Sequence, residues 1–189
     1  MKQSQILELI ERIGNLLRAE QRIIGSAQQL QPVHIQVLEY LNRCNKYSNT
    51  PAGVVKYFGI TKGTVSQSIN VLEKRSLVEK KTDLADKRSV HIIITAKGKK
   101  LLKTLLIKRS SFELAKNTDS KINNLVETEL KNILANLQKH NSYNTFGVCN
   151  TCRHLITEQN GFRCGLTKEV LSSADTTKIC HEHEYSEAV

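Results

Sequence analysis

Apolar residues recur at three- and four-residue spacing from residue 5 to residue 22, and this pattern predicts an amphipathic helix. A second helix is expected from Pro32, which suits a first helical turn, to about Cys44. Because one face of the first helix is apolar, that helix needs a partner surface to cover it.

Two more helices are expected after a polar, turn-like stretch at residues 45–49. Thr50 is the predicted N-cap of a short helix that ends at Gly59. Thr61 is the predicted N-cap of a fourth helix over about residues 62–75. The positions of this fourth helix that should face the core are Val65, Ile69 and Leu72.

A hairpin and further helices should follow. Residues 77–81 and 90–95 have strand-like patterns, and the charged segment 82–89 joins them. Apolar stripes of helical spacing then cover residues 101–106 and 122–137. The second stripe has a near-heptad rhythm and is too long for one small domain to cover, which favours a homodimer that also uses the N-terminal helix; an intrachain helix pair is the alternative.

This order of elements is typical of a winged helix-turn-helix, a mainly α fold with a small β-hairpin wing. To it we add a helical dimerisation region and a small metal-stabilised C-terminal tail. The tail has few aliphatic residues and many turn formers, so it cannot build a core unaided. The expected regions are an N-terminal dimerisation helix, the DNA-binding domain, C-terminal dimerisation helices and a cysteine-rich module, at residues 1–30, 31–98, 99–141 and 147–185.

The net charge of +10 is concentrated in one part of the chain. Residues 51–110 hold fourteen Lys and Arg against four Asp and Glu, whereas the rest of the chain is balanced. A local basic field attracts polyphosphates and gains affinity by releasing their counterions, so double-stranded DNA is the expected partner. A solvated basic face is the alternative interpretation.

The fourth helix carries polar side chains that can bind DNA. In this fold it enters the major groove, where amide side chains can pair with adenine and hydroxyls can reach bases or phosphate. A cation at the helix start suits phosphate. The candidate residues are Lys62, Thr64, Ser66, Gln67 and Asn70.

The stretch from Val78 to Gly98 resembles the strand, wing, strand and helix start of the MarR family of bacterial regulators, with Asp86, Lys87, Arg88 and Ser89 matching its wing signature. The resemblance covers roughly residues 5–140. It implies that Arg88, with Lys87 beside it, contacts DNA, and that Asp86 orients the wing through a salt bridge. The cysteine-rich tail is not a standard part of that family, so its usual aromatic-ligand pocket is not assumed to be the sensor, and any small-molecule ligand is unknown.

Four of the five cysteines lie in the tail with the spacing C-x2-C-x11-C-x15-C, and they predict a metal site: Cys149, Cys152, Cys164 and Cys180. Only one close pair is present, which favours a [4Fe–4S] cluster over a structural zinc ion. The pattern also loosely resembles high-potential iron–sulfur proteins. Zinc is the alternative, with His181 or His183 as substitute ligands, while His154 is expected beside the site and Cys44 is expected to be a small buried residue.

We therefore predict a transcriptional regulator, most simply a repressor, that binds a pseudo-palindromic operator as a homodimer and is modulated by the cysteine module through the adjoining dimerisation helix. Alternatives are an architectural DNA-binding protein with a structural zinc tail, and a redox enzyme or electron carrier. The sequence has no Gly-rich phosphate loop or catalytic triad pattern, so an enzyme is not expected. It also has no long apolar run or secretory signal, so the prediction is a cytoplasmic protein with no membrane partner.

Overall fold

The computed structural model describes residues 5–84, 86–109, 119–140, 146–159 and 161–185. The helical break predicted just after residue 140 lies mostly outside these ranges, as do parts of the predicted regions 1–30 and 99–141. The expected helices and the hairpin are all present, with ends within a few residues of the predicted ones. They are α1 (Gln5–Ser26), α2 (Pro32–Arg43), α3 (Pro51–Phe58), α4 (Lys62–Lys74), β1 (Val78–Thr82), β2 (Val90–Ile94), α5 (Ala96–Ile107) and α7 (Ser120–His140).

The caps that the sequence predicts are formed. The Thr50 hydroxyl accepts a hydrogen bond of 3.0 Å from the backbone N–H of Gly53, and Pro51 occupies the first position of α3. The helix ends at Gly59, which has a φ of 62°. The Thr61 hydroxyl caps α4 by accepting from the Thr64 N–H at 3.2 Å. These local signals define both helices of the helix-turn-helix.

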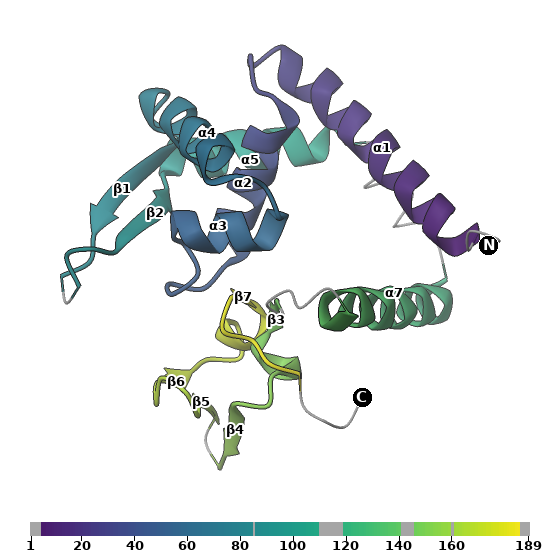
Figure 1. Ribbon diagram of the computed structural model, residues 1–189, viewed down its shortest axis with the longest axis vertical. Coiled ribbons are helices and arrows are strands. Elements are labelled where there is room, and N and C mark those ends of the chain that lie inside the picture. The colour runs from purple at the N-terminus through teal and green to yellow at the C-terminus, as the bar shows by residue number, and fades with distance from the viewer. Residues whose placement is uncertain (1–4, 85, 110–118, 141–145, 160, 186–189) are drawn as a thin grey trace.

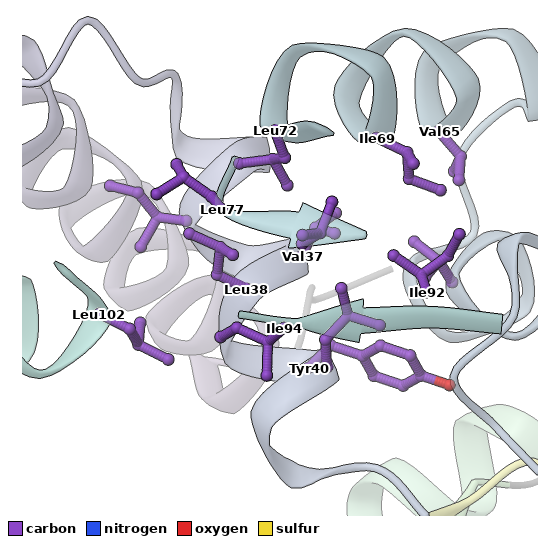
Figure 2. Close-up of a cluster of buried hydrophobic side chains, with 14 of the residues drawn as sticks. Val37, Leu38, Tyr40, Val65, Ile69, Leu72, Leu77, Ile92, Ile94 and Leu102 are labelled. Atoms are coloured by element: carbon purple, nitrogen blue, oxygen red, sulfur yellow. The ribbon is translucent and has the colours of Figure 1, made fainter. Parts of the chain in front are cut away.

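The core of the domain forms around α2. Figure 2 shows side chains from α2, α4, β2 and α5 that meet between the helices and the hairpin. Burying these apolar groups supplies most of the driving force for folding. The strands β1 and β2 pair in antiparallel register, with Val78 opposite Ile94. The labelled core residues are Val37, Leu38, Tyr40, Val65, Ile69, Leu72, Leu77, Ile92, Ile94 and Leu102.

The cysteine-rich tail forms small sheets that the sequence did not predict. One sheet pairs β3 with β7 and the other has the order β4-β5-β6, all antiparallel. Such two- to four-residue strands carry too few residues for a periodic pattern to emerge. The elements are β3 (Gly147–Val148), η1 (Cys149–Thr151), β4 (Leu155–Glu158), β5 (Gly161–Cys164), β6 (Val170–Leu171), η2 (Asp175–Thr177) and β7 (Ile179–Cys180).

This module packs against the winged helix domain, with β3 and β7 below α3 in Figure 1. Phe146 and Ile179 are buried and belong to the main hydrophobic core. The Phe146 ring meets that of Tyr57 on α3 edge to face, with centroids 5.3 Å apart. The Asn45 N–H donates to the Ile179 carbonyl at 2.9 Å. Phe146 and Ile179 thus pack into the core of the winged helix domain, which compensates for the small apolar content of the tail.

Apolar side chains remain exposed along α1 and α7, which lie on the same side of the molecule (Figure 1). Both helices are amphipathic by sequence, so these residues form uncovered apolar stripes. None of the helices within the described ranges has the length and apolar character needed to cross a membrane. The exposed residues include Ile6, Leu9, Ile13 and Leu16 of α1, and Ile122, Leu125, Val126, Leu130, Leu134 and Leu137 of α7.

The close packing of α5 on the hairpin gives a stability prediction. A Cβ atom on Gly98 would overlap the Leu77 carbonyl oxygen and lie 2.9 Å from Ile94 Cγ1, whereas a Cβ on Gly63 of α4 would meet only the Thr61 hydroxyl at 3.8 Å. Gly98→Ala should lower the free energy of unfolding by about 3 kcal/mol through overpacking. The control Gly63→Ala should raise it by up to about 1 kcal/mol. Urea denaturation measures both, and equal effects would contradict the packing described here.

Candidate nucleic-acid interface and cysteine cavity

The two faces of α4 are separated as the sequence predicts. Val65, Ile69 and Leu72 are buried, and the five candidate DNA-binding residues are exposed. The Asn70 side-chain oxygen accepts a hydrogen bond from Lys80 Nζ at 2.8 Å, and the Thr64 and Thr61 hydroxyls are 2.9 Å apart. The exposed set is Lys62, Thr64, Ser66, Gln67 and Asn70. The helix therefore presents one polar surface. Two of its exposed residues, Thr64 and Asn70, already have hydrogen-bonding partners within the protein.

Asp86 organises the turn of the wing. Its Oδ1 accepts hydrogen bonds from both the backbone N–H and the Nε of Arg88, each at 3.1 Å, and its Oδ2 accepts from the Ser89 hydroxyl at 3.2 Å. The Arg88 side-chain hydrogen bond is the main cause of the lowered pKa of Asp86. The Arg88 side chain is 92% exposed, and Lys87 beside it is exposed as well. The Asp86 carboxylate thus stabilises a turn on which the cationic side chains of Lys87 and Arg88 are exposed to solvent.

The base of the wing contains an interaction that sequence reasoning missed. The ring of His91 on β2 lies between two side chains: its Nδ1 is 2.5 Å from the side-chain oxygen of Asn49, and its Nε2 is 2.9 Å from Asp83 Oδ2. The Ile92 N–H also donates to the Asn49 carbonyl at 2.6 Å. Residues 49 and 91 are far apart in sequence, so no local pattern indicates this contact. It attaches the wing to the loop before α3.

The four tail cysteines line one cavity of about 180 Å³. They are contributed by η1 and its C-cap, by β5 and by β7, and all four are free thiols of intermediate exposure. His154 and His181 line the same cavity. His183 is placed differently: it is buried beside Gly147, and its Nε2 is 3.0 Å from the Thr151 hydroxyl. The four cysteines line this cavity, and of the two proposed substitute ligands His181 lines it whereas His183 does not.

The size of the cavity bears on what it can hold. Zinc binds thiolate at about 2.3 Å, so thiolates that share one zinc ion are only about 4 Å apart. In the part of the chain that the structure describes, no three His, Cys, Asp or Glu side chains are arranged to hold a single metal ion. A cluster distributes its thiolates over several iron atoms and needs a larger space. The four cysteines that line the cavity are the residues that would hold either group.

The thiols influence one another. Burial, together with the neighbouring thiols of Cys180, Cys152 and Cys164, raises the pKa of Cys149 to about 11. Burial likewise raises the pKa of Cys180, with Cys152 and Cys164 contributing. For Cys164, burial also acts upward but is outweighed by hydrogen bonds that include the side chain and backbone of Thr167, so its pKa is lowered. Cys149 and Cys180 are therefore neutral thiols near pH 7, and a cationic centre would be needed to hold them as thiolates.

One wall of the cavity comes from the winged helix domain. Asn45 and Tyr47, from the loop between α2 and α3, line it together with the cysteines. The Asn45 N–H donates to the carbonyl of Ile179, the residue before Cys180, and the Asn45 side chain lowers the pKa of the Cys180 thiol against the larger effect of burial. Cys44, just before this loop, is only partly buried, whereas the sequence predicted a buried residue; it packs against the hydrophobic core, and desolvation raises its pKa to about 12. Nothing in the sequence indicated that this loop would join the cysteine site.

Comparison with known proteins relates the domain to one family. Residues 28–89 match the profile of the MarR family. Over this range the winged helix domain is similar to the MarR family. The match spans less than half of the chain and includes α2 to α4 and the wing turn with Arg88. Members of the MarR family are transcription regulators and not enzymes, which agrees with the prediction that the chain is not an enzyme.

Solved structures extend the likeness in fold to the flanking helices. A MarR regulator from Methanosarcina mazei Go1 is 21% identical, with a TM-score of 0.61, and the match covers 72% of this chain and 99% of that one. The S. aureus MepR–DNA complex is 21% identical, with a TM-score of 0.57 and coverage of 68% and 96%. Apo MarR from E. coli is 21% identical, with a TM-score of 0.53 and coverage of 67% and 95%. No protein with a curated description matches the sequence.

The thiol environments predict an order of chemical reactivity. In reduced, metal-free protein at pH 8, iodoacetamide should modify Cys164 first, because a lowered pKa increases the fraction of reactive thiolate. Cys149 and Cys44 should react slowest, since their pKa values are raised to about 11 and about 12. Peptide mass spectrometry over a time course gives the order. Modification of Cys149 as fast as that of Cys164 would contradict the geometry of the cavity.

Proposed function

We propose that this chain is a DNA-binding transcription regulator that acts as a homodimer, and that its C-terminal module holds a [4Fe–4S] cluster that modulates DNA binding. The observation that carries the DNA-binding part is the match of residues 28–89 to the MarR family, with the polar face of α4 and the wing cations displayed on the basic part of the chain. The observation that carries the cluster is the single cavity lined by four cysteines.

In the proposed complex α4 lies in the major groove and the wing follows the DNA backbone into the minor groove. Gln67 and Asn70 are suited to base edges, and Lys62 to phosphate at the start of the helix. The exposed guanidinium of Arg88 suits a narrow minor groove, where negative potential is concentrated. Structures of MepR with DNA and of a mutant E. coli MarR with operator DNA, at 21% and 20% identity, support this mode for a shared fold.

The exposed apolar stripes of α1 and α7 support a homodimer. Each stripe repeats at helical spacing, and a second copy of the chain would bury both. A two-fold dimer would place its two α4 helices about 34 Å apart, in successive major grooves. It would therefore bind an inverted repeat, and binding within a promoter would repress transcription by blocking access to the DNA.

The cluster would be held by Cys149, Cys152, Cys164 and Cys180. When bound, it would supply a centre whose charge and integrity respond to oxidants. The chain itself contributes the hydrogen bond from the Thr167 N–H to Cys164 Sγ at 3.5 Å, which favours the thiolate form. Zinc remains the alternative occupant, and an architectural DNA-binding protein with a structural zinc tail is the alternative function.

The wing can be tested with a duplex selected from a random library by the unmodified chain. Arg88→Ala should weaken binding by about 1 to 3 kcal/mol and reduce the slope of log affinity against log salt by about one, because one cationic contact is lost. Arg12→Ala, which removes an exposed arginine from α1, serves as the matched control and should leave the slope unchanged. If Arg88→Ala changed neither the affinity nor its salt dependence, the wing would be excluded from the DNA interface.

The cofactor can be tested on anaerobically purified protein. A cluster gives a brown protein with visible charge-transfer absorption and with iron and sulfide in roughly equal amounts, as expected for a [4Fe–4S] cube. Cys152→Ser should lose most of this absorption, whereas Cys44→Ser should retain it, because Cys44 does not line the cavity. Stoichiometric zinc in a colourless protein would support the alternative occupant.

A further inference from the structure

We propose that the state of the cysteine cavity is transmitted to the wing through the loop between α2 and α3, residues 45–49, here named the coupling loop. This inference rests on the proposed function, because it names the route by which the cavity would regulate DNA binding. It replaces the route predicted from sequence, which ran through the dimerisation helix α7. Three consecutive sets of contacts support it.

The first set joins the cavity to the coupling loop. Asn45 and Cys180 line the same cavity, and the Asn45 N–H donates to the carbonyl of Ile179, the residue before Cys180, at 2.9 Å. The Asn45 side-chain oxygen accepts hydrogen bonds from the N–H groups of Tyr47 and Ser48, at 3.1 and 3.0 Å, and from the Ser48 hydroxyl at 2.7 Å. Asn45 thus connects the strand that carries Cys180 with the backbone of the loop. A shift of Cys180 would disturb the hydrogen bonds that shape the turn.

The second set joins β7 to the same turn. Ser48 is fully buried, and its hydroxyl accepts a hydrogen bond of 2.9 Å from the backbone N–H of His181, the residue after Cys180. The Ser48 carbonyl accepts another, of 2.7 Å, from the Tyr40 hydroxyl in the domain core. A buried polar group that loses its partner costs about 1 to 3 kcal/mol. Ser48 must therefore move together with β7 to keep its hydrogen bond with His181.

The third set joins the coupling loop to the wing. Asn49 follows Ser48 directly, and its carbonyl accepts from the Ile92 N–H of β2 while its side-chain oxygen contacts the His91 ring. The other nitrogen of that ring contacts Asp83, whose Oδ1 accepts from the Asp86 N–H at 2.8 Å. Asp86 in turn orients the outward-facing Arg88. A series of hydrogen bonds, joined by the Ser48–Asn49 peptide bond, therefore leads from His181, the residue after Cys180, to the proposed DNA-contacting arginine.

The contacts toward α7 are weaker. The Tyr185 hydroxyl donates to the side-chain oxygen of Gln138 at 3.4 Å, and Lys139 Nζ lies 5.8 Å from the Tyr185 ring centroid. The coupling loop, in contrast, has part-buried contacts of 2.5 to 3.0 Å on both its cavity side and its wing side. The loop also leads directly into the Thr50 cap of α3. Its position therefore affects the wing and the first helix of the helix-turn-helix, whereas α7 would affect only the spacing between subunits.

Hydrogen exchange tests the route without a known operator. Full-length protein purified anaerobically is compared with Cys152→Ser, which changes the cavity whatever group it holds. Loop amides 45–49 and the amides of residues 90–93 should exchange about tenfold faster in the variant, because the loop loses its anchor on β7. Peptides from residues 125–137 should change little. Changes confined to α7, or no change outside the module, would overturn the inference.

A pair of variants then tests the link to DNA, with the selected duplex as probe. Asn49→Ala removes the contact with His91 but leaves the cavity lining intact, and Tyr185→Phe removes the hydrogen bond to α7. We compare the DNA affinity of protein with a filled cavity and with an emptied cavity. In Asn49→Ala the ratio of these two affinities should fall to near one, while the iron content stays unchanged. Tyr185→Phe should keep the ratio of the unmodified protein. The reverse result would assign the coupling to α7.

The outcomes separate this inference from the proposed function. If the protein carries no iron, the proposed cluster fails, but faster exchange of the loop and wing in Cys152→Ser would still support the route. If the cluster is present and regulates DNA binding, yet Asn49→Ala leaves the affinity ratio intact, the proposed function stands and the coupling loop is wrong. Both readouts use the whole chain, so neither requires the module to fold alone.

Discussion

Buried polar groups in the loop between α2 and α3 connect the two halves of the molecule. Ser48 is excluded from solvent, and its hydroxyl and carbonyl are occupied by Asn45, by His181 from the module and by Tyr40 from the domain core. Because unpaired polar groups inside a protein are costly, these partners must stay together or move together. The remaining contacts of the module are built around this anchor.

The module needs that anchor because it has little apolar surface of its own. Phe146 and Ile179 contribute to the core of the winged helix domain, and the short strands pair over only a few residues. Four thiols then face one cavity in which burial and mutual repulsion raise the pKa of Cys149 and Cys180. A positively charged centre would relieve that repulsion and add cross-links, so binding it and ordering the module are parts of the same equilibrium.

Local signals predicted most of the winged helix domain from sequence alone. Thr50, Gly59 and Thr61 mark helix ends through contacts only a few residues long, and the turn around Asp86 is equally local. The common cavity of the cysteines was indicated by their spacing. The role of the coupling loop was not indicated by the sequence. Its hydrogen bond between Ser48 and His181 joins residues 133 positions apart and depends on how the tail packs against the domain. The tail sheets were missed because their strands are too short to form a pattern.

Filling the cysteine cavity should change the affinity of the winged helix domain for DNA. The most direct measurement is a fluorescence-anisotropy titration of one selected duplex, at fixed salt, with anaerobically loaded protein and with the same preparation stripped by a chelator under reducing conditions. We expect affinities that differ by about tenfold or more, equivalent to about 1.4 kcal/mol. Equal affinities for protein shown to be loaded and protein shown to be stripped would contradict it.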